Sequence, residues 1–288
     1  MIAAIKALRP KQWSKNVLLF AALLFSFRFL DSASVVRTLI GFLSFSFISS
    51  AGYVFNDIRD READANHPTK RLRPIASGAL PVPAAWALMA LVCLAGFAVA
   101  LWLSPAFALI ALLYLASTLS YSVYFKHYVI IDIMMLSVGF LWRAVAGAVV
   151  LGVLISPWLL VCTGFFSLFL GFNKRRGELD LLKDGADAHR RNLAEYSPAL
   201  LDEFQAITTS GTVISYALYC VLAAPTPWLL LTLPYVLYVI FRYIYLVQQK
   251  AEGGDPTSTL FKDIPILVCA VLYAVTTVVA LLVAGRSP

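Results

Sequence analysis

Long apolar segments alternate with short polar stretches along the whole chain. Most of these segments have roughly the twenty residues that an α-helix needs to cross the hydrocarbon of a bilayer, although the first and the sixth are shorter. Ser-Pro pairs at 104–105 and 156–157 predict tight hairpins. The pattern predicts an all-α, polytopic membrane protein with about nine transmembrane helices. The segments are 17–30, 35–55, 84–103, 105–125, 129–151, 157–173, 207–223, 227–247 and 264–284.

Composition supports a membrane protein and excludes a soluble domain of this length. Hydrophobic residues make up 60% of the 288 residues, charged residues make up 14%, and the mean hydropathy is +0.80. No long polar block is present to form a separate soluble domain. We therefore expect residues 1–288 to form a single integral membrane domain, with cytoplasmic polar loops near 56–80 and 171–198. The four cysteines lie in apolar segments without CxxC spacing, which is typical of packed core residues.

The distribution of basic residues predicts the topology. The net charge is +7, but the lysines and arginines lie mainly between apolar segments, so the pattern indicates membrane topology and argues against nucleic-acid binding. Assigning the amino terminus and every second loop to one side leaves only Arg28, Arg37 and Arg286 on the other. By the positive-inside rule, the rich side is cytoplasmic. We expect a multi-pass protein of the cell (inner) membrane, with a cytoplasmic amino terminus and active site.

The densest cluster of carboxylates follows the second apolar segment, in NDIRDREADANHPTKRLRPIASG at 56–78. If the helix continues, Asn56, Asp57, Asp60 and Asp64 lie within one arc of roughly 100°, and Arg59 and Glu62 lie outside it. Carboxylates on one face repel one another unless a cation lies between them, and Mg²⁺ is the usual cation beside phosphate groups. The pattern predicts a Mg²⁺ site for a diphosphate; the alternative is a solvated loop between membrane helices. Three cations follow that are placed to bind phosphate oxygens: Lys70, Arg71 and Arg73.

A second polar stretch, at 171–198, occupies the same point of the topology four helices later. This recurrence suggests a structural pseudo-repeat with two loops facing one cavity. Helical spacing gives Lys174, Arg175 and Glu178 the same relative angles as Asn56, Asp57 and Asp60. We therefore expect these three to face inward. By the same spacing, the acidic residues on the opposite, solvated side are Asp180, Asp184 and Asp187.

Isolated polar residues add further candidates for substrate binding. Arg143 lies inside an apolar segment, about 16 Å along the helix axis from Asp132 and on nearly the same face. An intramembrane arginine lines a polar cavity or pairs internally, and we favour a phosphate contact here over a structural role. Tyr121 and Lys126 lie at a polar helix end, where interfacial anchoring explains the tyrosine as well as substrate contact does. Lys15 in the basic amino-terminal lead completes this set.

These motifs resemble those of the UbiA superfamily of intramembrane prenyltransferases. The resemblance rests on NDxxDxxxD at 56–64, on the following HPTKRLRPIASG, and on about nine helices, and it covers nearly the whole chain. LRPKQWSKN, YFKHYVIIDI, LWRAVAG and KRRGEL resemble the branch that transfers phosphoribose to decaprenyl phosphate. The chain departs from the wider superfamily at Lys174, Arg175 and Glu178, where other members carry a second aspartate-rich motif. Two cations there suit an anionic second substrate such as a lipid phosphate.

The resemblance implies a UbiA-like helical bundle with a cytosol-facing central cavity and a defined reaction. The enzyme would be a polyprenyl-phosphate phosphoribosyltransferase that moves 5-phosphoribose from phosphoribosyl diphosphate to a polyprenyl phosphate and releases diphosphate, for cell-wall arabinan precursors. The catalytic residues implied are Asp57, Asp60, Asp64 and Glu178. Mg²⁺ would be held by Asn56 and the three aspartates, and the substrates by the cations and polar residues named above.

Two other functions remain open at this point. The first is transfer of a prenyl group from a prenyl diphosphate to an aromatic acceptor, with the same first motif and with Asp180 and Asp184 as the second. The second is transport, which predicts charges inside several helices, whereas here only Arg143 lies deep in an apolar segment. Chain length of the prenyl group and oligomeric state do not follow from the sequence.

Overall fold

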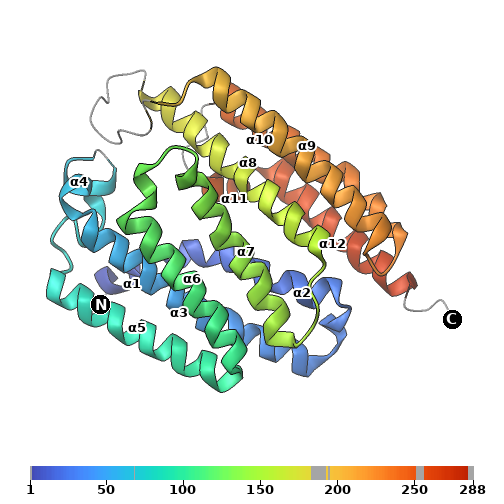
Figure 1. The fold of residues 1–288 in the computed structure, drawn as a ribbon, viewed down its shortest axis with the longest axis horizontal. Coiled ribbons are helices and arrows are strands. Elements are labelled where there is room, and N and C mark those ends of the chain that lie inside the picture. The colour runs from blue at the N-terminus through green and yellow to red at the C-terminus, as the bar shows by residue number, and fades with distance from the viewer. Residues whose placement is uncertain (1, 68, 183–192, 194, 251–255, 285–288) are drawn as a thin grey trace. The chain divides into compact units, whose positions relative to one another are not determined.

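The computed structural model describes residues 2–67, 69–182, 193, 195–250 and 256–284, and over these residues it consists of helices and connecting turns (Figure 1). The all-α prediction is thereby confirmed for the described part of the chain. Contacts between residues divide the chain into two compact units. Unit 1 comprises Met1–Leu23 and Arg28–Leu154, and unit 2 comprises Leu24–Phe27 and Ile155–Pro288.

Unit 1 is organised around one long helix, α3, which packs along α5 and also contacts α6, α7 and the 3₁₀ segment η1. This helix runs for 28 residues, and its carboxyl end leads directly into the first polar stretch. The elements of unit 1 are α1 (Ile2–Ala7), η1 (Pro10–Leu19), the start of α2 (Phe20–Phe25), η2 (Arg28–Leu30), α3 (Ser32–Arg59), α4 (Arg61–Ala65), η3 (Lys70–Leu72), α5 (Val82–Leu103), α6 (Pro105–Val123), η4 (Phe125–His127) and α7 (Ile131–Leu151).

The helix ends of unit 1 follow from capping residues in the sequence. The side chain of Asp31 accepts hydrogen bonds from the backbone N–H groups of Ala33 and Ser34, which begins α3. Ser104 ends α5 and caps α6 by accepting from the N–H of Phe107, and the following proline fits the first helical turn. The predicted hairpin at 104–105 is therefore confirmed. Gly152 ends α7 in the left-handed conformation, which glycine adopts without steric cost.

Two glycines allow unusually close packing inside unit 1. A Cβ on Gly96 would lie 2.6 Å from the Ile48 side chain, and the carbonyl of Gly96 instead accepts a hydrogen bond from Ser44 at 2.8 Å. A Cβ on Gly147 would lie 2.2 Å from the carbonyl oxygen of Leu19. The first contact joins α3 to α5, and the second joins the end of η1 to α7. The amino-terminal segment is thus packed into unit 1 by direct backbone contact.

Unit 2 is built from α8 and α9, which pack along each other, with α10 and α12 added to them. A hydrophobic core lies where α8 meets α10, around the buried residues Phe169, Ile240 and Tyr243. The elements of unit 2 are the end of α2, α8 (Pro157–Leu182), α9 (Pro198–Leu222), η6 (Pro227–Thr232), α10 (Leu233–Lys250), α11 (Pro256–Lys262) and α12 (Ile264–Ala284).

Six helical segments of the described chain are long and apolar enough to cross a membrane: Ser32–Arg59, Val82–Leu103, Pro105–Val123, Ile131–Leu151, Pro227–Lys250 and Ile264–Ala284. The predicted number of nine is therefore not confirmed. Helices α8 and α9, of 26 and 25 residues, are not among these six, and α9 carries Asp202 and Glu203 in its second turn. The predicted segment 17–30 is divided among η1, α2 and η2, and the positive φ of 60° at Phe27 separates α2 from η2.

Candidate active site

The first polar stretch leaves the end of α3 on a nearly continuous helical path. Helix α3 ends at Arg59 and α4 begins at Arg61, with Asp60 between them. The backbone N–H of Asp60 still donates to the carbonyl of Asn56 at 2.9 Å, and that of Asp64 donates to Asp60 at 2.8 Å. Because these i to i−4 bonds persist, the acidic residues stay on one side. Arg59, predicted to lie outside their arc, is exposed, as is the similarly placed Glu62.

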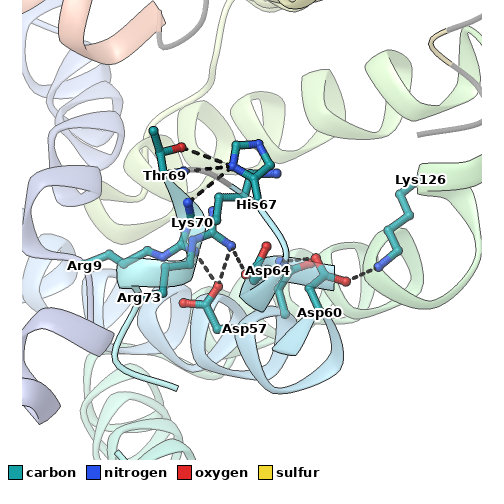
Figure 2. A network of polar contacts seen from close by, with 10 residues as sticks. Arg9, Asp57, Asp60, Asp64, His67, Thr69, Lys70, Arg73 and Lys126 are labelled. Carbon is teal, nitrogen blue, oxygen red and sulfur yellow. Dashed lines mark hydrogen bonds and ion pairs between the residues drawn. The ribbon is translucent and has the colours of Figure 1, made fainter. Parts of the chain in front are cut away.

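Two of the three aspartates share one guanidinium group (Figure 2). Arg73 Nη1 lies 3.0 Å from Asp57 Oδ1 and 2.5 Å from Asp64 Oδ2. Asp57 also pairs with Arg9 Nη2 through the same carboxylate oxygen. The side chains of Asp57 and Asp64 are only 2% and 5% exposed, so both carboxylates are buried among cations of this chain. A positively charged nitrogen thus occupies the space between two carboxylates.

The third aspartate has a separate set of partners. Asp60 Oδ1 lies 2.5 Å from Lys126 Nζ, and Asp60 Oδ2 accepts a hydrogen bond from Asn56 Nδ2 at 2.9 Å. Lys126 comes from η4, between α6 and α7, and Figure 2 shows it reaching Asp60 from the far end of the group. We call these residues the charge cluster. Its members are Asp57, Asp60, Asp64, Arg9, Arg73 and Lys126.

The sequence did not identify Arg9 as a site residue, although it lies in the basic lead. Its backbone adopts φ 51° and ψ 60°, a left-handed conformation that is uncommon for a residue other than glycine. The turn that follows is held against α3, because Trp13 Nε1 donates to Ser50 at 2.9 Å and Ser50 donates to the Leu8 carbonyl at 2.8 Å. These bonds fix the backbone on both sides of Arg9 and so place its guanidinium on Asp57. An arginine before proline is a weak sequence signal for this role.

Arg143 is buried in unit 1 and satisfied by groups of the protein itself. Its Nε donates to Asn16 Oδ1 at 2.7 Å, its Nη1 to the Gly139 carbonyl at 2.8 Å and its Nη2 to the Tyr114 hydroxyl at 2.9 Å. Its guanidinium also lies 4.8 Å from the centre of the Tyr114 ring. Asn16 belongs to η1, so Arg143 ties this segment to α7. These contacts favour a structural role over the phosphate contact expected from the sequence.

The remaining predicted residues of unit 1 come from three elements, η3, η1 and α6. Lys70 is half-buried in η3, and its backbone N–H donates to His67 Nδ1 at 3.3 Å. Arg71 is exposed beside it. Lys15 and Tyr121 are half-buried in η1 and α6. Their roles in substrate binding stay predictions.

Unit 2 brings together the three residues predicted to face inward from the second polar stretch. Glu178 Oε2 lies 2.5 Å from Arg175 Nη1, and Glu178 Oε1 lies 3.7 Å from Lys174 Nζ. The Arg175 side chain is only 1% exposed, and the Glu178 carboxylate compensates part of its buried charge. The side chain of Asp180, and residues Asp184 and Asp187, lie outside the described part of the chain. Their predicted place on the solvated face stays a prediction.

The donor set of the charge cluster fits a divalent metal that shares its coordination with phosphate oxygens. The described residues contain no group of three or more acidic, histidine or cysteine side chains arranged to hold a metal by themselves. Asp57 and Asp64, however, already share one cationic nitrogen. Mg²⁺ is commonly bound by one or two carboxylates with substrate phosphates and water completing the octahedron. The Asp57–Asp64 pair is therefore the best candidate for a Mg²⁺ site, and Asp60 lies apart from it with Lys126.

Two relatives are similar to this chain over most of its length. A decaprenyl-phosphate phosphoribosyltransferase of Corynebacterium glutamicum is 36% identical over 285 residues, which is 96% of this chain and 86% of the relative. A protein of the same name from Mycolicibacterium smegmatis is 33% identical over 276 residues, covering 90% of this chain and 86% of the relative. Both alignments include the polar stretches of units 1 and 2.

The fold has a counterpart among solved structures, and the sequence matches a family model. A UbiA homolog from Archaeoglobus fulgidus, solved with GPP and Mg²⁺ bound, superposes with a TM-score of 0.75 at 19% identity, covering 96% of this chain and 99% of the other. The model of the UbiA prenyltransferase family matches residues 17–264. The enzyme class and the family expected from the sequence are thereby confirmed. This chain is a transferase and belongs to the UbiA prenyltransferase family.

Proposed function

We propose that this protein transfers 5-phosphoribose from phosphoribosyl diphosphate to a polyprenyl phosphate such as decaprenyl phosphate. The products are polyprenyl-phosphoryl-5-phosphoribose and diphosphate, and the reaction depends on Mg²⁺. The observation that carries the proposal is identity of 33–36% to two decaprenyl-phosphate phosphoribosyltransferases over at least 90% of this chain. The lipid product is an activated pentose of the kind that cell-wall arabinan synthesis consumes.

The charge cluster is the proposed site for the diphosphate of the donor. When bound, Mg²⁺ neutralises charge that builds on the diphosphate as its bond to C1 of the ribose breaks. Asp57 and Asp64 hold this ion from the protein side. Arg9, Arg73 and Lys126 bind phosphate oxygens, for which arginine offers two parallel N–H groups. The cluster thus stabilises the leaving group without a proton transfer.

The proposed acceptor is an anion at neutral pH, so a strong general base is unnecessary. A phosphate oxygen of the lipid attacks C1 of the ribose, which carries positive charge in the transition state. The Lys174, Arg175 and Glu178 group of unit 2 supplies two cations and one carboxylate, which suits binding of a phosphate. Glu178 holds the Arg175 guanidinium in a fixed orientation. We therefore assign this group to the lipid phosphate.

We place the reaction at the cytoplasmic side of the cell membrane. The six apolar helices of the described chain and the family are those of a multi-pass membrane protein. The distribution of lysine and arginine supports the orientation, because the charge cluster lies on the lysine- and arginine-rich side. Phosphoribosyl diphosphate and Mg²⁺ are cytosolic, and the lipid enters from the bilayer.

Transfer of label into lipid tests the proposal directly. Purified protein in detergent is incubated with Mg²⁺, radiolabelled phosphoribosyl diphosphate and decaprenyl phosphate, and label is counted in an organic extract. We expect transfer that EDTA abolishes. A parallel reaction with a labelled prenyl diphosphate and an aromatic acid examines the alternative activity. Transfer in this second reaction alone, from protein shown to be folded, would overturn the proposal in favour of an aromatic prenyltransferase.

A further inference from the structure

The charge cluster of unit 1 is electrically balanced by the protein itself. Three carboxylates face three cations, and each carboxylate has at least one cation within 3.0 Å. In two of the pairs, Arg9 with Asp57 and Lys126 with Asp60, the partners are 48 and 66 residues apart in the sequence. Three separate segments of the chain thus each supply one cation to the three aspartates, so tertiary packing creates the cluster. Within the cluster, each of the three carboxylates is therefore already compensated by a cation of the protein.

We propose that Arg9 and Arg73 close the Asp57–Asp64 pair to divalent metal in the free protein, so that the metal enters only together with a diphosphate. On entry, the two guanidinium groups move from the carboxylates to the phosphate oxygens, and the carboxylates, which stay in place, bind the metal. Every charged group exchanges one partner for another of the same sign. The inference rests on the proposed function, because it assigns a diphosphate to this cluster.

Electrostatics disfavours the entry of a metal alone. A divalent ion between Asp57 and Asp64 must displace Arg73 Nη1, which lies between the same two carboxylates. The displaced guanidinium then lies beside a doubly charged cation at a partly buried position, where charge repulsion is poorly screened. A diphosphate removes this penalty because its oxygens accept the displaced N–H groups. Metal and diphosphate therefore promote each other's binding.

Burial shows which partners move during the exchange. The Arg9 and Arg73 side chains are 24% and 25% exposed, whereas those of Asp57 and Asp64 are 2% and 5% exposed. Packing therefore holds the carboxylates in place, and the long arginine side chains have room to turn toward solvent. The backbone before Arg9 is held by the bond from Ser50 to the Leu8 carbonyl, while the guanidinium contacts Asp57 and lies 5.5 Å from the centre of the Tyr53 ring. The cluster thus pairs buried carboxylates with partly exposed arginines, as the proposed exchange requires.

The proposal makes opposite predictions for metal and for diphosphate when one arginine is neutralised. In Arg73→Gln, the carboxylates lose their bridging cation, so binding of a metal alone becomes tighter. The same variant lacks a phosphate ligand, so binding of diphosphate in the presence of metal becomes weaker. A merely structural role for Arg73 predicts weaker binding in both cases. Arg9→Gln is expected to change both affinities in the same directions by a smaller factor, because Asp57 keeps Arg73.

Mn²⁺ binding to the detergent-purified protein provides the test, with free Mn²⁺ counted by electron paramagnetic resonance. Wild type, Arg73→Gln, Arg9→Gln and the control Arg61→Gln are titrated first with Mn²⁺ alone and then with inorganic diphosphate at fixed Mn²⁺. Arg61 is exposed on α4 and controls for loss of one positive charge nearby. Coupling between two ligands typically amounts to a factor of about 5 to 150. We expect Arg73→Gln to tighten Mn²⁺ binding about tenfold and to weaken diphosphate binding by a similar factor.

Equal affinity of wild type and Arg73→Gln for Mn²⁺ alone would overturn the proposal, as would tight binding of Mn²⁺ alone by wild type. Thermal unfolding of each variant shows whether it is folded, and Arg9→Gln supplies an independent answer if Arg73→Gln is not. The Mn²⁺ titration contains no sugar donor. A cluster that behaves as expected in a protein that transfers no phosphoribose would leave this inference standing and reject only the proposed donor.

Discussion

The polar ends of units 1 and 2 differ in how their charged side chains are compensated. In unit 1, three aspartates are paired with cations that come from the amino-terminal lead, η4 and the segment after η3. In unit 2, Lys174, Arg175 and Glu178 all belong to one turn of α8. The first group is balanced and rich in metal-binding oxygen, whereas the second carries a net positive charge. This difference supports our proposal that the group in unit 1 binds a metal diphosphate and the group in unit 2 binds a phosphate.

Removing a carboxylate from the charge cluster should have the largest effect on activity, and it tests the difference between the two groups most directly. Asp64→Asn removes a charged ligand at the position shared with Asp57 and Arg73, and we expect kcat/KM for phosphoribosyl diphosphate to fall by roughly 10²–10³-fold or more, the magnitude typical of losing one group that stabilises charge in the transition state. Asp57→Asn and Asp60→Asn should behave similarly. The label-transfer assay at saturating Mg²⁺ measures the effect.

Glu62→Gln is the matched control for these aspartates. Glu62 is an exposed carboxylate on α4, two residues from Asp64, so its loss removes the same charge without removing a member of the cluster. We expect its activity to stay within about twofold of wild type, as for surface substitutions in general. Equal damage by Glu62→Gln and Asp64→Asn would show that overall charge of the loop, rather than ligation, supports activity.

The next largest effect should come from unit 2 and should fall on the other substrate. Glu178→Gln leaves the buried Arg175 guanidinium without its carboxylate, so we expect the KM for polyprenyl phosphate to rise about tenfold, equivalent to about 1.4 kcal/mol, with the KM for phosphoribosyl diphosphate unchanged. Asp202→Asn breaks the exposed Arg176–Asp202 pair, at 3.3 Å, and serves as the control. An increase in the KM of the sugar donor instead would show that the two groups do not divide the substrates.

The sequence predicted one of these two groups better than the other. Lys174, Arg175 and Glu178 were derived from helical spacing, and contacts between residues three or four apart on a helix follow from that spacing. Helical spacing also placed Asp57, Asp60 and Asp64 on one face, and this holds because the helical hydrogen bonds continue through Asp60. The pairing of these aspartates with Arg9, Arg73 and Lys126 depends on tertiary packing. Sequence spacing carries no information about contacts between residues 48 and 66 positions apart.

The same distinction between local and tertiary interactions explains which parts of the fold the sequence predicted. Proline, serine, aspartate and glycine caps act locally, so the hairpin at Ser104 and most helix positions were predicted. The segment 17–30 was wrongly taken as a single span because its composition is apolar, whereas the positive φ at Phe27 that interrupts it does not follow from composition. Arg143 was favoured as a phosphate ligand for a related reason. Its partners Asn16 and Tyr114 lie on other segments and were invisible in the spacing of α7.

A smaller effect is expected at the opposite end of unit 1, on stability rather than activity. Arg37 donates to the carbonyls of Val150 at 2.6 Å and Leu103 at 2.8 Å, at the carboxyl ends of α7 and α5. A cation at a helix carboxyl end also interacts favourably with the helix dipole. Arg37→Met keeps an apolar stem and removes both bonds, which we expect to cost about 2 kcal/mol and to lower the thermal midpoint in detergent by a few degrees.

Arg28→Met serves as a milder variant with which Arg37→Met can be compared. Arg28 makes one longer bond of this kind, 3.4 Å to the carbonyl of Leu151, so its loss should lower the midpoint less. Neither variant should change the KM of either substrate, because both arginines lie on the side predicted to be away from the cytoplasm. These two arginines also account for exceptions to the positive-inside pattern, since each one caps a helix end. A reversed order of midpoints would contradict this assignment.

The smallest effect concerns the charged pair that joins α10 to the start of α12 in unit 2. Arg242 Nη2 donates to Asp263 at 2.9 Å, and Asp263 also accepts from the backbone N–H of Ile266 at 3.0 Å. The hydrogen bond from Arg242, followed by that from Ile266, lowers the pKa of Asp263 below its ordinary value of 3.8 despite an opposing effect of burial. Asp263→Asn should therefore lower the thermal midpoint slightly at pH 7.

The pH dependence separates this electrostatic contribution from simple packing. A carboxylate whose pKa is lower in the folded than in the unfolded state stabilises the fold above the unfolded value, and the contribution disappears as pH falls through the folded value. The midpoints of wild type and Asp263→Asn should differ at pH 7 and converge as the pH falls below about 3.8. Arg242→Met combined with Asp263→Asn should be no less stable than Arg242→Met alone, because the interaction is already lost. A difference that persists at low pH would mean that Asp263 acts through its shape as a helix cap, and that the ion pair contributes nothing measurable to unit 2.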